Sequence, residues 1–206
     1  MITFAEYSSL KTSQGIKVFR YNTVFQSDKG GGDVIGLVCM MNPGIAQPES
    51  CEIFCKLLTT EYKTKGLVVT KPDPTMKKAM NFIKKAYEIN KVKLPERYTI
   101  YVENLFNLRE KKSKDAKKLA ISLKETSNLM FSSRELAETY QFVWLAWGNT
   151  NINNQKQNSL LKKFPDAIKV HKSNYKGELR ETDYPVHPLY MNEDYFLEVA
   201  LNRVKK

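Results

Sequence analysis

Two patterns of apolar residues alternate along the chain. One is a short continuous apolar run and the other is an apolar residue at every third or fourth position. The run at residues 33–41 is apolar almost throughout, which is typical of a strand covered on both faces of a parallel sheet. Similar runs predict strands at 66–70, 98–103, 140–147 and 167–170, and the second pattern predicts helices at 48–62, 74–90, 153–164 and 192–204.

The helix at 74–90 has the clearest signals. Asp73 is placed to cap it and Pro74 occupies its first position. Lys77 falls away from the apolar face, so it either contacts phosphate groups or is solvated. Asn192 is the expected cap of the last helix, and residues 173–191 read as a long polar loop.

Strands and helices follow one another in alternation, which predicts a three-layer α/β/α fold with a central, mainly parallel sheet. Residues 15–25 alternate in polarity and predict a strand or hairpin arm, and the turn at 27–33 contains three glycines. We therefore expect one α/β domain over residues 1–206, with an N-terminal part at 1–33 and a core at 34–206.

Polar turns follow three of the predicted strands. They are Asn42-Pro43-Gly44, Glu103-Asn104 and the turn at 147–149, and a late loop carries His187-Pro188-Leu189-Tyr190. The carboxyl ends of adjacent parallel strands meet at one edge of a sheet, so these turns are expected to share a crevice. Carboxamides can both donate and accept hydrogen bonds and aromatic rings can stack, a combination suited to a flat heterocycle.

The charge of the chain favours a polyanionic partner. There are 33 Lys and Arg against 22 Asp and Glu, a net charge of +11 with pI near 9.4. We expect nucleic acid or a nucleotide as the partner, with DNA favoured over RNA by the resemblance described below, the alternative being a basic surface that only confers solubility. No run of 18 apolar residues and no signal peptide pattern occur, so we expect a cytoplasmic protein without membrane contact.

The residue inventory argues against several kinds of site. Cys51 and Cys55 are one helical turn apart, but with Cys39 they make only three cysteines and both histidines are far away. We therefore expect reduced, mostly buried thiols, no metal and no cofactor. The predicted crevice also lacks a Ser/His/Asp set and the paired carboxylates of glycosidases.

The landmarks resemble those of domain-of-unknown-function family 1643. They are "MNPG" at 41–44, "DPT" at 73–75, "ENLFNLR" at 103–109, "WG" at 147–148 and "HPLY" at 187–190. The resemblance covers roughly residues 16–195, and the family has no established activity to carry over.

The same order of motifs is similar to that of the uracil-DNA glycosylase superfamily, and "NPG" in particular resembles its mismatch-specific and thymine-DNA glycosylase branch. The resemblance implies a uracil-DNA glycosylase-like fold and a monomer that excises a modified or mismatched pyrimidine. It implies that Asn42 positions the attacking water, since a carboxamide cannot accept a proton as a carboxylate does. Pro43 and Gly44 would shape the base pocket, with Gly44 leaving room for a 5-substituent.

The remaining roles also come from the resemblance. Asn104 would bind the edge of the flipped base and His187 would donate to the departing base, unless His187 is only a structural residue of its loop. The base-stacking aromatic is not identified by the motifs, and Phe54 and Phe106 are candidates. The residues expected at the nucleic acid are Leu189 and Tyr190 as wedges and Arg109, Lys111, Lys112 and Lys77 at phosphates.

Three interpretations remain open at this point. The first is a glycosylase-like N-glycosidase acting on a flipped-out base in DNA. The second is a non-catalytic module of the same fold that binds nucleic acid or a nucleotide, which the carboxamide at position 42 favours. The third is an enzyme acting on free nucleotides, for which a net charge of +11 is less important.

Overall fold

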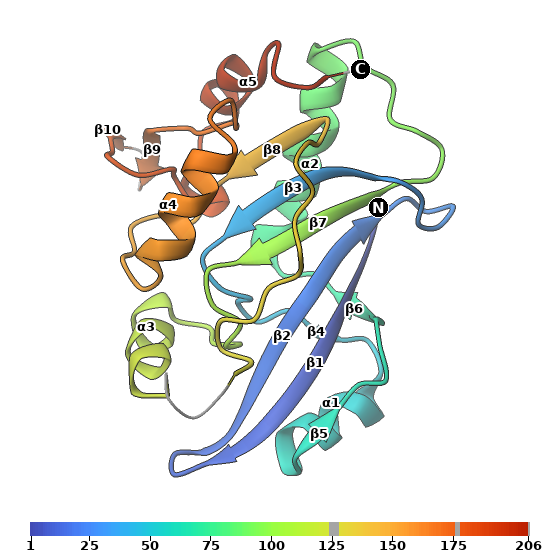
Figure 1. The fold of residues 1–206 in the computed structure, drawn as a ribbon, viewed down its shortest axis with the longest axis vertical. Coiled ribbons are helices and arrows are strands. Elements are labelled where there is room, and N and C mark those ends of the chain that lie inside the picture. The colour runs from blue at the N-terminus through green and yellow to red at the C-terminus, as the bar shows by residue number, and fades with distance from the viewer. Residues whose placement is uncertain (124–127, 176–177, 206) are drawn as a thin grey trace.

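The structure is a computed structural model that describes residues 1–123, 128–175 and 178–205. Within these residues one large sheet has the strand order β4-β6-β1-β2-β7-β3-β8, with β5 also paired to β1, and β9 and β10 form a separate antiparallel pair (Figure 1). The strands are β1 (Ile2–Thr12), β2 (Gly15–Gln26), β3 (Val34–Met40), β4 (Gln47–Pro48), β5 (Tyr62–Lys63), β6 (Val68–Lys71), β7 (Thr99–Asn104), β8 (Phe142–Leu145), β9 (Lys172–Tyr175) and β10 (Glu178–Glu181). The helices are α1 (Cys51–Thr59), α2 (Pro74–Ile89), α3 (Ser113–Ser122), α4 (Asn154–Lys163), the short 3-10 helix η1 (Pro188–Tyr190) and α5 (Glu193–Ala200).

The large sheet is mixed, which corrects the expectation of a mainly parallel one. β3 pairs in parallel with β7 and with β8, whereas β2 is antiparallel to both β1 and β7. The physical reason lies in the first 26 residues, where a two-residue turn joins β1 to β2. A turn this short can connect only antiparallel strands. Gly15 supports the turn with a φ of +86°.

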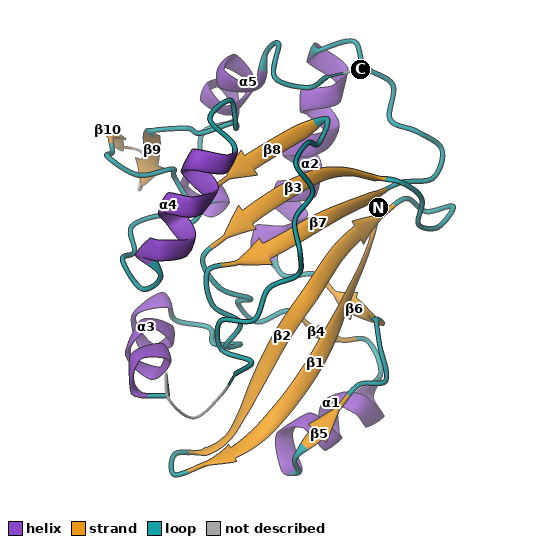
Figure 2. Cartoon of the chain, viewed as in Figure 1, coloured by secondary structure: helices purple, strands orange, loops and turns teal. Residues whose placement is uncertain are grey.

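Helices cover both faces of the sheet, so the described fold is mixed α/β in three layers (Figure 2). On one face, α2 and α5 pack on side chains of β3, β7 and β8. On the other face, α3 and α4 pack on the alternate side chains of β3 and β8. The continuous apolar run predicted at 33–41 has its explanation here, because β3 lies between helices on both sides.

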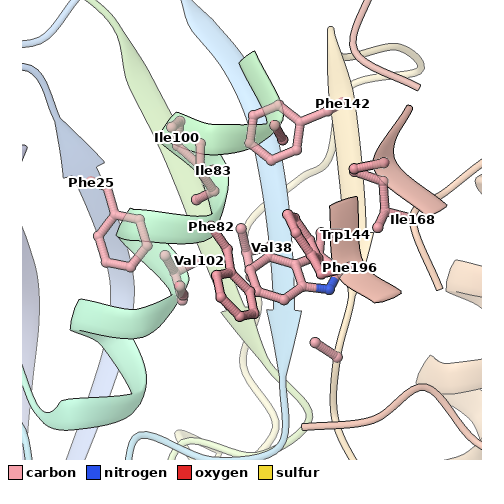
Figure 3. Close-up of a cluster of buried hydrophobic side chains, with 14 of the residues drawn as sticks. Phe25, Val38, Phe82, Ile83, Ile100, Val102, Phe142, Trp144, Ile168 and Phe196 are labelled. Carbon is pink, nitrogen blue, oxygen red and sulfur yellow. The ribbon is translucent and has the colours of Figure 1, made fainter. Parts of the chain in front are cut away.

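An aromatic cluster ties α5 to the sheet. The ring of Phe196 in α5 lies 4.8 Å from that of Phe82 in α2 and 4.7 Å from that of Trp144 in β8, between ring centroids (Figure 3). All three side chains are buried. Ring pairs at such distances add to the stabilisation that burial alone provides. The cluster therefore fixes the position of the loop that precedes α5 and carries His187.

Several sequence expectations fail in the second half of the chain. Residues 113–122, for which the sequence predicts no element, form α3, whose Ala116 and Ala120 are buried against the sheet. The predicted loop at 173–191 contains most of β9 and all of β10. The apolar run at 167–170 forms no strand, and Ile168 makes only an isolated bridge to Trp144. Short amphipathic segments of this kind depend on the surface they pack against, which local sequence does not reveal.

The cysteines also differ from expectation. Cys39 is buried in β3, and its burial raises the pKa of its thiol to about 12. Cys51 and Cys55 are exposed on α1. The expectation of mostly buried thiols is therefore wrong, because α1 uses its opposite face, with Leu57, to contact the sheet.

Removing the cap of α5 is expected to weaken the fold slightly. The Asn192 side chain accepts a hydrogen bond from the Asp194 backbone N–H at 2.8 Å. Asn192→Ala should lower the free energy of unfolding by about 1 kcal/mol in urea denaturation. Asn158→Ala, on the exposed face of α4, serves as the control and should change it by less than about 0.5 kcal/mol. Equal effects of the two variants would argue against the cap.

Candidate functional site

A cavity of about 550 Å³ opens where β3 and β8 end. Its walls come from segments that are distant along the chain: β2, the turn after β3, the start of α2, α3 and the residues before it, the turn after β8, and the segment from β9 to η1. Asn42 and His187, the two side chains expected to carry the chemistry, both line it. Three of the four turns that the sequence places in one crevice contribute to it, those at 42–44, 147–149 and 187–190, whereas Glu103 and Asn104 do not line it.

Asn42 lies two residues after the end of β3 and is held by one contact. Its side-chain Nδ2 donates to the backbone carbonyl of Glu110 at 3.2 Å. No described residue donates to its Oδ1, and the side chain is only partly buried. The carboxamide is thus oriented with its acceptor oxygen left available, which suits binding of water or of a ligand N–H.

Gly44 and Asp73 meet at the cavity wall. Gly44 has a φ of +63°, and a Cβ at this position would lie 2.4 Å from Asp73 Oδ2. Asp73 uses its other oxygen, Oδ1, to accept the Met76 N–H at 2.9 Å and so caps α2. The room beside Gly44 is therefore filled by a carboxylate, which corrects the expectation that it is left open for a base substituent.

The loop carrying His187 is anchored on two sides. Lys78 of α2 donates through Nζ to the carbonyls of Leu189 and Met191, at 3.2 and 2.9 Å. On the other side, Gly148 donates its N–H to the Pro185 carbonyl at 2.8 Å, and a Cβ on Gly148 would lie 3.1 Å from His187 Cβ. The loop and the turn after β8 thus fit closely only because residue 148 is a glycine.

His187 is a neutral imidazole at neutral pH. Burial lowers its pKa to about 4, Lys78 acts in the same direction, and the Asp73 carboxylate opposes both. Its Nδ1 accepts the Leu189 N–H at 3.4 Å. In a neutral ring whose Nδ1 is an acceptor, the proton resides on Nε2. The side chain lining the cavity therefore has one N–H to donate.

The lowered pKa of His187 predicts a pH-dependent stability. The unfolded chain takes up a proton near pH 6.5, while the folded protein does so only near pH 4. The contribution of His187 to the free energy of unfolding is fully present above pH 6.5 and is lost as the pH falls toward 4. The difference in unfolding free energy between wild type and His187→Gln should fall by on the order of 2 kcal/mol from pH 7 to 4.5 in urea denaturation, allowing for partial exposure. A constant difference would contradict the assignment.

Asn104 does not reach the cavity wall, contrary to expectation. It is buried at the end of β7, its carbonyl accepts from Lys156 Nζ at 2.7 Å, and its Oδ1 has no donor among the described residues. The chain continues beside β3 after this residue, with hydrogen bonds from Leu105 and Phe106 to the carbonyls of Met40 and Met41. This continuation encloses the amide, so it is not displayed at a strand end.

The two candidate stacking rings also lie elsewhere. Phe106 is fully buried in the core between the sheet and the helices α3 and α4. Phe54 lies on α1, with its ring centroid 5.1 Å from the Arg109 guanidinium. That guanidinium donates to the carbonyls of Ala46 and Ile45 at 2.9 and 2.8 Å, so Arg109 holds the loop after Gly44 and does not line the cavity.

The other residues expected at nucleic acid divide into two groups. Leu189, Tyr190 and Lys111 are exposed and line the cavity. Lys112, at the start of α3, and Lys77, on α2, are exposed but lie outside its wall. Pro43 lines the cavity beside Asn42. The wedge and phosphate roles thus have candidates at the mouth, whereas Lys77 belongs to a solvated helix face.

Several cavity residues were missed from the sequence. The sequence predicts only the role of a helix cap for Asp73. Its position in the motif "DPT", between "MNPG" and "ENLFNLR", was a signal that it belongs to the site. Arg20 is a charged residue between Phe19 and Tyr21 in the alternating strand β2, and an arginine at an inward position of a strand marks a functional charge. Lys117 lies in the unpredicted helix α3, where its Nζ donates to the Asn149 carbonyl. Arg180 lies in the unpredicted β10.

Two other kinds of site are absent from the part of the chain that the structure describes. Over residues 1–123, 128–175 and 178–205, no group of three or more His, Cys, Asp or Glu side chains is arranged to hold a metal ion. In the same residues, no helix is both long and apolar enough to cross a bilayer.

The model of the family described as "Protein of unknown function (DUF1643)" matches residues 66–189. This stretch contains Asp73, Gly148 and His187, whereas Asn42 and Gly44 precede it. No curated protein and no solved structure matches the chain.

Proposed function

The chain belongs to the DUF1643 family of proteins of unknown function, and from its site we propose that it is a DNA glycosylase-like enzyme. The proposed reaction is hydrolysis of the N-glycosidic bond of a flipped-out pyrimidine that is modified or mismatched. Flipping is least costly for such bases, because their stacking or pairing is already weakened. The family has no assigned activity, so the proposal depends on the cavity.

One observation carries the proposal: Asn42 and His187, far apart in the sequence, line the same cavity. The cavity is of the size that small-molecule sites usually have, and it is large enough for a single base. Its mouth carries Lys111 and the exposed side chains of Leu189 and Tyr190. Basic and apolar groups at a mouth suit a nucleic acid that must be held while one nucleotide is displaced.

The proposed chemistry divides the reaction between three side chains. A water oriented by Asn42 Oδ1 attacks the anomeric carbon, and the Asp73 carboxylate accepts the proton of that water. The bond from the anomeric carbon to the base nitrogen breaks, and its electron pair leaves with the base. The Nε2–H of neutral His187 donates to the base oxygen on which the negative charge develops. Asp73 thus supplies the carboxylate that position 42 lacks.

A non-catalytic binding module is the second candidate, favoured by the carboxamide at position 42. In that case the same cavity would accept a base or nucleotide without breaking a bond. The two functions differ in one product, the abasic site.

The deciding experiment uses labelled oligonucleotides containing uracil, a thymine mismatch or a bulky 5-substituted pyrimidine, followed by alkali to cleave at abasic sites. Wild type should produce cleavage with at least one of them. Asn42→Ala should lower the rate roughly 10-fold, because the water is no longer oriented. Asn158→Ala on the exposed face of α4 is the control and should retain the full rate. Salt-dependent binding without any abasic product would favour the binding module.

A further inference from the structure

A buried guanidinium lies at the cavity wall without an acidic partner. Arg20 of β2 is only 1% exposed, yet it lines the cavity. Its Nη1 donates to the thioether sulfur of Met76 at 3.1 Å, and its Nε has no acceptor. Among the described residues, no carboxylate lies within 4.0 Å of it. A thioether is a weak acceptor, and the Tyr7 side chain is the other polar group that interacts with this guanidinium. The buried Nε–H is left without an acceptor.

Such an arrangement is costly unless something else satisfies it. Burying a charged group without a charged or strongly hydrogen-bonding partner is among the most unfavourable changes in a protein interior. The buried Glu103 in this chain shows the usual solution, with ion pairs to Arg134 at 2.9 Å and to Lys156 at 3.1 Å. Arg20 lacks an equivalent, which points to a partner that is not part of the protein.

The surroundings of Arg20 add further positive charge. Besides Arg20, the cavity is lined by Lys111, Lys117 and Arg180, against the carboxylates of Asp73 and Glu181. Arg109 is close enough that the charge of Arg20 helps to lower the pKa of Arg109, after the larger effect of burial. The lining thus carries four cationic and two anionic side chains, of which Arg180 is itself paired with Glu178. A planar guanidinium fork such as that of Arg20 matches the oxygens of phosphate.

We propose that the wall of the cavity at Arg20 is an oxyanion site that takes a phosphate group. The group comes either from a small ligand with a terminal phosphate, such as a nucleoside monophosphate, or from an internal phosphodiester of DNA. Arg20 provides the buried charge and Lys111 and Lys117 provide the outer ones. This site goes beyond the proposed base excision and does not depend on it, since phosphate can bind whether or not a base is released.

The first test observes Arg20 in the wild-type protein. With ¹⁵N-labelled arginine, the Nε–H resonance of Arg20 is followed by NMR while inorganic phosphate is added, and chloride at equal ionic strength is the control. We expect a saturable shift with one phosphate bound, and little change with chloride. The absence of a shift, or equal shifts with both salts, would show that Arg20 only balances the protein's own charges and would overturn the proposal.

Two further ligands distinguish the source of the phosphate. Thymidine 5′-monophosphate carries a terminal phosphate, and the dinucleotide TpT has only an internal diester. A shift of the Arg20 resonance with the monophosphate, at a concentration at least 10-fold below that needed for inorganic phosphate, supports a small ligand. A shift with TpT at equal concentration supports DNA. Failure of both ligands together with inorganic phosphate rejects the site, whereas the oligonucleotide assay separately judges base excision.

Substitutions provide an independent readout. Arg20→Met keeps much of the length of the side chain and removes its charge, and Arg20→Lys keeps the charge without the fork. Both should weaken phosphate binding at least 10-fold in calorimetry, with Lys77→Met on the exposed face of α2 as the matched control. Circular dichroism establishes that each variant is folded. Unchanged binding in folded Arg20→Met would contradict the proposal, and the wild-type NMR titration decides it if that variant does not fold.

Discussion

Replacing His187 with alanine is expected to lower the rate of base release at least about 100-fold. The neutral imidazole has its proton on Nε2, and in the proposed reaction this N–H stabilises the negative charge of the departing base. Without it, the charge develops in a partly buried cavity with no donor in its place. The rate is measured by alkaline cleavage under single-turnover conditions, so that product release does not mask the chemical step.

The second histidine provides a matched control for this prediction. His171 is exposed, its Nδ1 lies 3.0 Å from the Thr182 carbonyl, and it is not a cavity residue. His171→Ala should keep the wild-type rate. If His187→Ala also keeps it while remaining folded, His187 is a structural residue of its loop and the proposed leaving-group role is wrong.

Gly44→Ala is expected to abolish most of the activity and to destabilise the protein as well. The positive φ alone costs an L-residue roughly 1–2 kcal/mol. In addition, the new methyl group would lie 2.4 Å from Asp73 Oδ2, so either the turn or the carboxylate must move. Displacement of about 1 Å at a reacting group can reduce rates 100-fold. We expect at least that loss in the oligonucleotide assay and a total of more than about 2 kcal/mol in urea denaturation.

Two variants separate the causes. Gly15→Ala changes a glycine with a φ of +86° and nothing within 4 Å of the added carbon, so it should show the backbone cost without a contact. Asp73→Ala also removes the cap of α2, so the double variant with Gly44→Ala should lose less stability than the sum of the two single losses, because the close contact is removed. If Gly44→Ala costs no more than Gly15→Ala, the contact between residue 44 and Asp73 is unimportant.

The elements that sequence could predict are those whose signals are local. β3 is continuously apolar because helices cover both faces, and α2 has its cap Asp73, its Pro74 and a regular apolar face. These signals act within a few residues, so they are visible without knowledge of the fold. The carboxyl ends of parallel strands meet at one edge of a sheet, and on this basis the sequence predicts that the turn after β3 shares a crevice with the His187 loop. Both line one cavity.

The errors concern features decided by distant parts of the chain. Asn104 ends a strand, as expected, but the next residues remain bonded to β3 and enclose it. Arg109 looked like a free cation, yet the carbonyls of residues 45 and 46 use its donors. The sequence predicts a strand or hairpin arm at 15–25 but no strand at Ile2–Thr12, so it does not reveal the antiparallel pairing of β1 with β2 that makes the sheet mixed. Each outcome required knowledge of contacts between segments remote in sequence.

The position of β3 has a consequence for any shortened form of this chain. β3 lies between β7 and β8, which are not paired with each other, and it delivers Asn42 and Gly44 to the cavity. The segment matched by the family model contains Asp73 and His187 but not β3. Residues 66–189 alone would therefore leave β7 and β8 without the strand that joins them and the cavity without Asn42 and Gly44. A shortened chain that keeps His187 and Asp73 but begins after β3 should thus be unable to form the site.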